Sequence, residues 1–450
     1  MEEQSLLPDV LRAFLPPRPD VPPRPVPERV GEPSVFKHVV YVIKENRTYD
    51  QVFGDLPQGN GDPSLTTLGR EVSPNHHALA EEFVLLDNYY CNGVNSADGH
   101  SWATEGNSTD HLEKAFGGFS RSYTFGDDPL TYSTTGFVWD NVMAHGKTFR
   151  NYGEFDYATP VPFTDNWLDI YNDFIDNGRL DTYRFQKSIG VERVLEHTDP
   201  DYPGWNMKIP DIVRADIFIR RLQEHDADPE SEWYNFMLVY LPEDHGGGGP
   251  TLRAHMADND LALGRVVDAI SRSRFWNETV IFVNEDDPQA GLDHVDGHRS
   301  LCLVVSPYTK RGAVISEFYS QTSVLHTMQQ ILGCPPMNQM DAMATLMTEC
   351  FNDTPDVTPY TVRPATWDLT EGVSTVQADM DPRERAWAER IAKINLTRPG
   401  MKTPDDDDAL NRYFWHQAMG WDTPYPEEWA GHHGRGLGEL GLLWEEGEED

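Results

Sequence analysis

Residues 285–299, EDDPQAGLDHVDGHR, combine four aspartates, two histidines, a glutamate and an arginine in fifteen positions. The run TVIFVN directly before them is apolar and has the length of a buried strand. Adjacent carboxylates such as Asp286 and Asp287 repel each other near a buried strand end unless a positive charge lies between them. Carboxylates and imidazoles are the ligand types that divalent metal ions accept. The segment therefore predicts a metal site at the end of this strand.

The alternative for this segment is an ordinary solvated loop. The chain has 74 acidic residues against 36 basic ones, so acidic clusters also arise by chance. Against chance, polar side chains follow other apolar runs of strand length, and ligands of parallel sheets bind beyond the carboxyl ends of the strands. We therefore expect these side chains to converge. In chain order they are Glu45 and Asn46, then Ser96, then Asp244 and His245, then Asp286 and Asp287, with His294 and His298 before the next strand.

The elements that position these residues follow from the hydrophobic pattern. Apolar runs of strand length occupy residues 35–44, 82–90, 233–241, 279–284 and 300–306. Apolar spacing of three and four predicts helices over residues 211–225, 257–273, 323–332 and 381–396. Apolar strands that alternate with amphipathic helices are typical of an α/β fold. We expect a largely parallel central sheet flanked by helices.

The composition also divides the chain. Residues 1–33 are rich in proline and predict an extended strap or linker, and residues 34–335 carry the α/β pattern of the main domain. Within it, residues 107–205 are rich in aromatic residues, Asp and Gly without clear periodicity. We interpret them as an inserted cap that shapes a pocket, with a plain surface excursion as the alternative. Residues 336–450 predict a C-terminal extension that packs on the domain and ends in an acidic tail.

The bulk properties exclude some functions. A formal net charge of −38 repels nucleic acid and acidic membranes, and no window has the apolar length of a transmembrane helix. The N-terminus lacks a basic leader and a long apolar segment, so we expect a cytoplasmic protein, or an exported one if the chain is a mature or trimmed form. The four cysteines are too few and scattered for a disulfide framework, although Cys334 and Cys350 could pair around a loop.

The order of these groups resembles that of the alkaline phosphatase superfamily. The segment HVVYVIKENRTYDQVFGD is similar to the opening motif of the bacterial phosphoesterase family that includes phospholipases C and acid phosphatases. The nearest resemblance is to phosphoesterase domains attached to β-propellers, in which a similar proline-rich strap precedes this motif. The resemblance covers roughly residues 20–335 and implies an alkaline-phosphatase-like fold. The segments ENRTYD and EDDPQAGLDHVDGHR carry most of its specificity.

The resemblance implies a divalent ion and a serine nucleophile. The ligands would be Glu45, Asn46, Ser96, Asp286 and Asp287, with Ser96 as the nucleophile. Zinc is favoured by the resemblance, and manganese or calcium also suits an oxygen-rich ligand set. Asp98 and Gly99 stand where relatives usually have Pro and Asn. This departure leaves Ser101 and Thr104 open as alternative nucleophiles, and a capping role for Ser96 is the structural alternative.

A second metal ion stays open. Many superfamily members hold it through Asp-x-x-x-His and a later His, whereas Asp244 and His245 are adjacent here. The residues that would bind a second ion are Asp244, His245, His294 and His298. Alternatively, the histidines contact the phosphoryl group directly, together with Arg299.

The resemblance implies hydrolysis of small phosphate mono- or diesters through a phosphoseryl intermediate. Proton transfer would fall to His100, His245 or His298, and substrate binding to His294 and Arg299. We expect a substrate with a single phosphoryl group and no binding of nucleic acid or integral association with membranes. The alternatives are a sulfatase-like or phosphonate-cleaving relative, although no Cys-x-Pro-x-Arg motif occurs, and a non-catalytic, metal-stabilised binding module.

Overall fold

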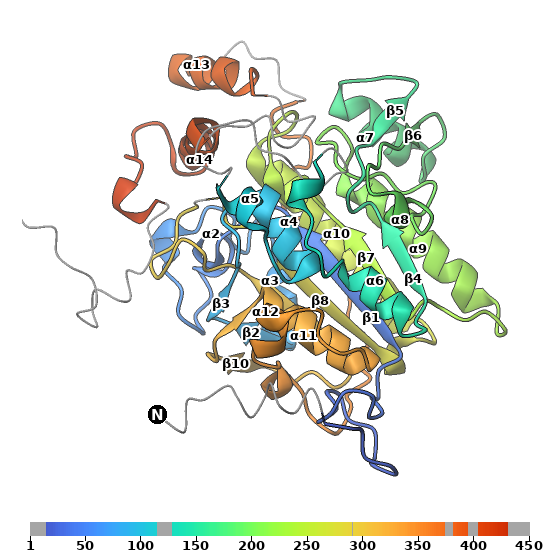
Figure 1. Ribbon diagram of the computed structural model, residues 1–450. Helices are drawn as coiled ribbons and strands as arrows, with labels where there is room; N and C mark the ends of the chain where they lie inside the picture. Colours follow the sequence, from blue (N-terminus) through green and yellow to red (C-terminus); the bar gives the residue numbers. More distant parts are fainter. Residues whose placement is uncertain (1–14, 115–127, 290, 374–380, 395–403, 431–450) are drawn as a thin grey trace, which may run out of the picture.

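The computed structural model describes residues 15–114, 128–289, 291–373, 381–394 and 404–430 (Figure 1). Its centre is a five-stranded sheet in the order β4-β7-β1-β8-β9. Strands β4, β7, β1 and β8 are parallel, and β9 is antiparallel to β8. The bounds are β4 (Phe149–Tyr152), β7 (Phe236–Tyr240), β1 (His38–Lys44), β8 (Thr279–Glu285) and β9 (Cys302–Val305). The prediction of an α/β fold with a largely parallel sheet is confirmed.

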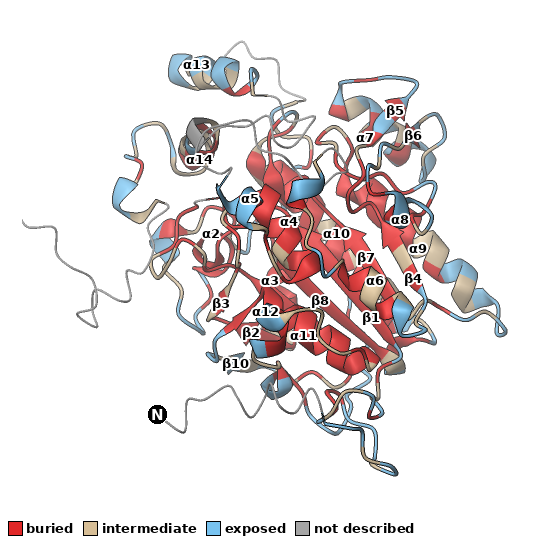
Figure 2. Cartoon of the chain, in the orientation of Figure 1, coloured by how far each residue is buried: buried red, intermediate tan, exposed pale blue. Residues whose placement is uncertain are grey.

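Both faces of the central strands are buried, which explains why β7, β1, β8 and β9 are nearly continuous apolar runs and do not alternate with polar residues. Val40 and Val42 of β1 pack with α9 and α10 in one hydrophobic cluster. Val39 and Tyr41, which point to the opposite face, pack with α4, α6 and α11 in a second cluster. Figure 2 shows the central strands buried between the two helical layers.

Most of the predicted helices are present. The helices of the described residues are α2 (Tyr49–Phe53), α3 (Pro74–Glu82), α4 (Ser96–Glu105), α5 (Asp110–Lys114), α6 (Val138–Ala144), α7 (Trp167–Asn177), α8 (Glu192–Leu195), α9 (Asp211–Ala227), α10 (Leu252–Arg272), α11 (Gln321–Leu332), α12 (Gln339–Met343), α13 (Pro382–Ile391) and α14 (Pro404–Met419). Among them, none has the length and apolar character needed to cross a membrane.

The segment 82–90 differs from its prediction as one strand. It forms β2 (Val84–Leu86) and β3 (Tyr89–Tyr90), which lie outside the central sheet. These strands pair in parallel with β10 (Ala313–Ile315) and β11 (Tyr319–Ser320), respectively. The two remaining strands, β5 (Thr159–Val161) and β6 (Arg184–Gln186), form an antiparallel pair. An apolar run does not specify which sheet it joins, because partner strands lie far away in the sequence.

The regions around the main domain have defined contacts. The proline-rich strap is held by an ion pair between Arg18 and Glu32 at 2.7 Å, and Gln330 of α11 donates to the carbonyl of Pro27. The edge strand β4 comes from the segment 107–205, where the sequence did not predict a strand. All four cysteines are buried free thiols, so Cys334 and Cys350 do not pair. The acidic end of the chain lies outside the described residues.

Candidate active site

The carboxyl ends of β1 and β8 bring two polar pairs together. Because these neighbouring strands are parallel, with Lys44 opposite Glu285, the residues that follow each of them lie side by side. The Asp286 N–H donates to the Lys44 carbonyl at 2.9 Å, and the Asn46 N–H donates to Asp286 Oδ1 at 3.2 Å. Asn46 has a φ of 68°, a left-handed conformation that asparagine tolerates better than most residues. The strand has therefore ended, and the chain turns sharply at this pair.

Ser96, from a different segment of the chain, lies next to Glu45 and Asn46 at this edge of the sheet. It is the first residue of α4, and the side chain of Asn95 caps this helix by accepting from the Ala97 N–H. The Ser96 hydroxyl lies 3.5 Å from Glu45 Oε2 and 3.3 Å from the side-chain amide of Asn46. It is buried, as are the other side chains of the cluster. The predicted position of Ser96, after a strand and at the start of a helix, agrees with this geometry.

The two alternative nucleophiles make other contacts. The Thr104 hydroxyl donates to the His100 carbonyl one turn earlier in α4, at 2.7 Å. The Ser101 hydroxyl interacts with Glu105 near the end of the same helix. Of the three candidates, Ser96 is the one whose hydroxyl contacts Glu45 and Asn46.

Carboxylates crowd around the Asn46 side chain. One end of its amide lies 3.0 Å from Glu45 Oε2, 2.8 Å from Asp286 Oδ1 and 3.0 Å from Asp287 Oδ2. Burial, with the neighbouring Asp287 and Glu45 carboxylates, raises the pKa of Asp286 well above its usual range. An amide brings no net charge, and its two N–H groups cannot satisfy three carboxylates. Together, the carboxylate oxygens of Glu45, Asp286 and Asp287 are ligands of the type that suits a divalent cation.

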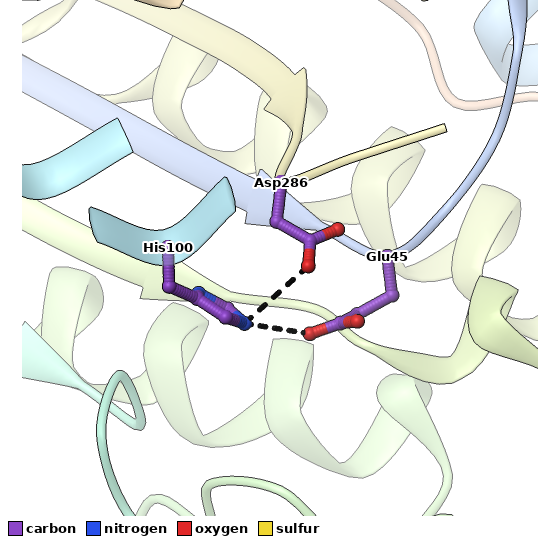
Figure 3. A group of neighbouring side chains, drawn as sticks. All are labelled: Glu45, His100 and Asp286. Atoms are coloured by element: carbon purple, nitrogen blue, oxygen red, sulfur yellow. Dashed lines mark hydrogen bonds and ion pairs between the residues drawn. The ribbon is translucent and has the colours of Figure 1, made fainter. Parts of the chain in front are cut away.

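His100 completes this cluster (Figure 3). Its Nε2 lies 3.0 Å from Glu45 Oε1 and 3.5 Å from Asp286 Oδ2, and the three side chains form a potential metal-binding group. On the other side of the ring, Nδ1 lies 2.9 Å from Glu154 Oε1. Burial alone would lower the pKa of His100, but the Glu154 and Glu45 carboxylates outweigh it and raise the pKa well above its usual range.

Sequence reasoning missed two residues of the site. The Tyr240 hydroxyl donates to Glu45 Oε1. Tyr240 is the last residue of β7, so the rule that ligand-binding groups gather at strand ends could have found it. Glu154 follows β4, which the sequence did not reveal as a strand.

Of the two predicted residues in the loop after β7, His245 lies at the site and Asp244 has another role. His245 is buried, and its Nε2 lies 3.2 Å from the Asn46 amide. Asp244 instead forms a buried ion pair with Lys44 at 2.7 Å, and its other oxygen accepts from the Glu45 N–H. One oxygen of Asp244 thus binds the Lys44 ammonium group, and the other binds the backbone of Glu45 next to the site. Its predicted role as a metal ligand is not supported.

His294, His298 and Arg299 lie outside the cluster around Glu45. His294 Nδ1 lies 2.6 Å from Asp50 Oδ2, and these two residues form a second potential metal-binding group with Asp293. Arg299 donates from Nε to Asp293, from one terminal nitrogen to the carbonyls of Asn60 and Asp87, and from the other to Asp50. It is fully buried and is held by these four residues. His298 is partly exposed and lies 3.0 Å from Asp296. None of the three belongs to the group of Glu45, His100 and Asp286 found among the described residues.

Comparisons with known proteins agree with the motifs. Residues 250–335, which include β8, Asp286 and Asp287, match the Phosphoesterase family. This confirms the resemblance to that family, while the attachment to a β-propeller stays a prediction. No match was found among curated proteins.

Several solved structures are similar in fold. An alkaline phosphatase superfamily protein from Vibrio parahaemolyticus is 14% identical, covering 92% of this chain and 97% of that one, with a TM-score of 0.43. The PsFucS1 sulfatase from Pseudoalteromonas sp. is 12% identical, covering 73% of each chain, with a TM-score of 0.46. Murine ectonucleotide pyrophosphatase/phosphodiesterase 5 is 10% identical, covering 70% of this chain and 100% of that one, with a TM-score of 0.39.

Proposed function

We propose that the chain is a hydrolase of small phosphate mono- or diesters that depends on a divalent metal ion and uses Ser96 as its nucleophile. The observation that carries this proposal is the placement of the Ser96 hydroxyl against Glu45 and Asn46, where Asp286 and Asp287 also converge. The match of residues 250–335 to the Phosphoesterase family supports phosphate esters as the substrate class.

The metal ligands we propose are Glu45, Asn46, Ser96, Asp286 and Asp287. A divalent ion bound by them would stabilise negative charge on the serine oxygen and on the phosphoryl oxygens. Zinc, manganese and calcium all accept oxygen ligands of this kind, and we expect at least one ion. Asp244 is paired with Lys44 and does not meet His294, which instead forms a second potential metal-binding group with Asp50 and Asp293; a second ion therefore stays a prediction.

The chain's own residues then perform a two-step displacement. The Ser96 oxygen attacks phosphorus, its proton passes toward the Glu45 carboxylate that it already faces, and the bond to the alcohol breaks. The leaving oxygen takes a proton from a histidine of the site, His100 or His245. Water then attacks the phosphoseryl group and gives a proton to the same histidine, while the bond between phosphorus and the serine oxygen breaks and Glu45 returns the proton to Ser96. A monoester substrate releases phosphate by this step, and a diester releases a phosphate monoester. His298, which is partly exposed beside Asp296, is a weaker candidate for proton transfer.

The net charge favours a small substrate. At −38 the protein repels each phosphate of a polynucleotide, whereas a single phosphoryl group at a metal site avoids most of this cost. We therefore propose that polynucleotides are poor substrates.

The test compares two serines of α4. Purified protein is assayed for bound metal and for turnover of an aryl phosphate, an aryl phosphodiester, an aryl sulfate and single-stranded DNA. Ser96→Ala should lower the rate with the preferred phosphate substrate by several orders of magnitude while the fold persists, and Ser101→Ala should change it little. If Ser101→Ala abolishes activity and Ser96→Ala does not, the nucleophile is misassigned. Preferred turnover of the sulfate would replace phosphate by sulfate as the substrate class.

A further inference from the structure

Glu154 is a buried carboxylate next to the site that the reaction above does not use. It follows β4 and places Oε1 2.9 Å from His100 Nδ1. The opposite nitrogen, Nε2, then faces Glu45 at 3.0 Å and Asp286 at 3.5 Å. The imidazole is thus held between Glu154 on one side and two proposed neighbours of the metal on the other; Figure 3 shows the side toward Glu45 and Asp286.

The backbone around Glu154 is strained. Gly153 has a φ of 93° and Phe155 a φ of 60°, and the latter is uncommon for an aromatic residue. Strain of this kind persists only where the surroundings impose it, and it clusters at functional sites. Here Asn151 holds the turn: its Nδ2 donates to the Glu154 carbonyl at 2.9 Å, and its Oδ1 accepts from the Glu154 N–H at 3.2 Å. The Phe155 ring packs edge-on against Trp139, with the ring centroids 5.6 Å apart.

The second carboxylate oxygen gives independent support. Glu154 Oε2 is buried and has no hydrogen-bond partner among the described residues. Leaving a buried carboxylate half satisfied is costly, so a glutamate with only a structural role is a poor choice at this position. The strained turn therefore places the Glu154 carboxylate against His100.

We infer that Glu154 is a positioning residue that fixes the orientation of the His100 ring toward Glu45 and Asp286. This inference rests on the proposed function and adds His100 Nε2, which belongs to the potential metal-binding group with Glu45 and Asp286, to the proposed ligands. A carboxylate that binds the far nitrogen of an imidazole fixes its tautomer and ring orientation, and loss of such a partner typically lowers metal affinity or activity 10- to 100-fold. The hydrogen bond, and not the negative charge alone, is what orients the ring.

The variants separate orientation from stability. Glu154→Ala should weaken metal binding and lower kcat by roughly 10- to 100-fold, with a smaller change in KM. Glu154→Gln, which still offers an oxygen to Nδ1–H, should restore most of both. The matched control is Glu105→Ala, since Glu105 is another buried glutamate, at the far end of α4. It should lower the melting temperature without changing the affinity for metal.

A second measurement does not depend on activity. In metal-free protein labelled with ¹⁵N-histidine, the hydrogen-bonded Nδ1 proton of His100, assigned by its loss in His100→Gln, should disappear in Glu154→Ala and persist in Glu154→Gln. Unchanged NMR signal, metal affinity and kcat in Glu154→Ala would overturn the inference. Wild-type protein that neither binds metal nor turns over an ester would contradict the proposed function instead, and the NMR comparison would still decide the role of Glu154.

Discussion

Three carboxylates dominate the chemistry at the scale of single residues. Glu45, Asp286 and Asp287 surround one amide in a buried space, and the raised pKa of Asp286 expresses the cost of this crowding. Without a cation, their mutual repulsion destabilises the folded protein. Metal binding removes this cost, so the stability of the protein should depend on the ion.

We therefore predict that a divalent ion raises the melting temperature of the wild-type protein. An ion at a thousand times its Kd contributes about 4 kcal/mol of stability. Asp286→Asn should abolish this effect and make the metal-free protein more stable than metal-free wild type, because one repelling charge is gone. Thermal unfolding with zinc, manganese or a chelator measures both. Asp296→Asn, in the same loop, is the control and should respond to metal as wild type does.

A second prediction at this scale concerns pH and Glu105. Burial raises the pKa of Glu105 to about 8. Between about pH 4.3, where an exposed glutamate titrates, and pH 8, the folded protein keeps a proton that the unfolded chain has lost. The free energy of unfolding should therefore fall as the pH rises through this window, by up to about 1.4 kcal/mol per pH unit from this residue.

Glu105→Gln should remove this contribution, since a glutamine fills similar space without titrating. The measurement is urea unfolding of both proteins from pH 5 to pH 8. The stability difference between variant and wild type should grow with pH. A difference that stays constant over the whole range would mean that Glu105 does not retain its proton.

At the scale of elements, the contact between α4 and the end of β8 decides where Ser96 lies. Gly99 makes this contact: a Cβ added there would lie 2.4 Å from the Asp286 carbonyl oxygen. Glycine is therefore needed at position 99, because any side chain would push the helix away from the strand end. The nucleophile and the metal ligands depend on the same close approach.

Gly99→Ala should accordingly displace α4 and lower kcat/KM by roughly 100-fold, the usual effect of moving a reacting group by about 1 Å. Circular dichroism should show that the fold persists. Gly146→Ala is the control: a Cβ there meets nothing within 4 Å, but the left-handed φ of 74° strains the backbone, so this variant should lose stability and keep its kcat/KM. Full activity of Gly99→Ala would show that α4 adjusts without moving Ser96.

At the scale of the whole molecule, the C-terminal segment 404–430 packs around the site. Asn411 of α14 donates to the Gln289 carbonyl, and the Phe414 ring lies below the Arg47 guanidinium. Leu292 pairs with Ala430, and Leu292 also packs with Trp415 in a small hydrophobic cluster. Each of these partners is close in sequence to a residue of the site. Since the site's side chains are buried, we predict that this segment moves for an ester to enter.

A disulfide between Leu292→Cys and Ala430→Cys should therefore inhibit the enzyme. The two positions form an isolated antiparallel bridge, a geometry that suits a disulfide. We expect the oxidised double variant to lose at least tenfold in kcat/KM and to recover when it is reduced. The native cysteines are buried, and the two single variants control for the substitutions. An oxidised variant as active as the reduced one would show that the substrate enters by another route.

The sequence alone was sufficient to predict the positions of polar residues that directly follow a strand. Glu45, Asn46, Asp286 and Asp287 were predictable because neighbouring parallel strands necessarily bring their carboxyl ends to one edge. The position of Ser96 was predictable because it opens a helix after an apolar run. These inferences need only the local pattern and the general geometry of parallel sheets.

Only the tertiary structure decided how the remaining charged residues are used. Lys44 pairs with Asp244, which lies 200 positions away in the sequence, and Asp50 pairs with His294 and Arg299. The predicted site residues Asp244, His294 and Arg299 therefore form ion pairs inside the protein. Glu154 joined the site through an edge strand that no hydrophobic pattern revealed. A charged side chain in a buried network is assigned by the opposite charge nearest in space, and the spacing of residues along the chain does not contain that distance.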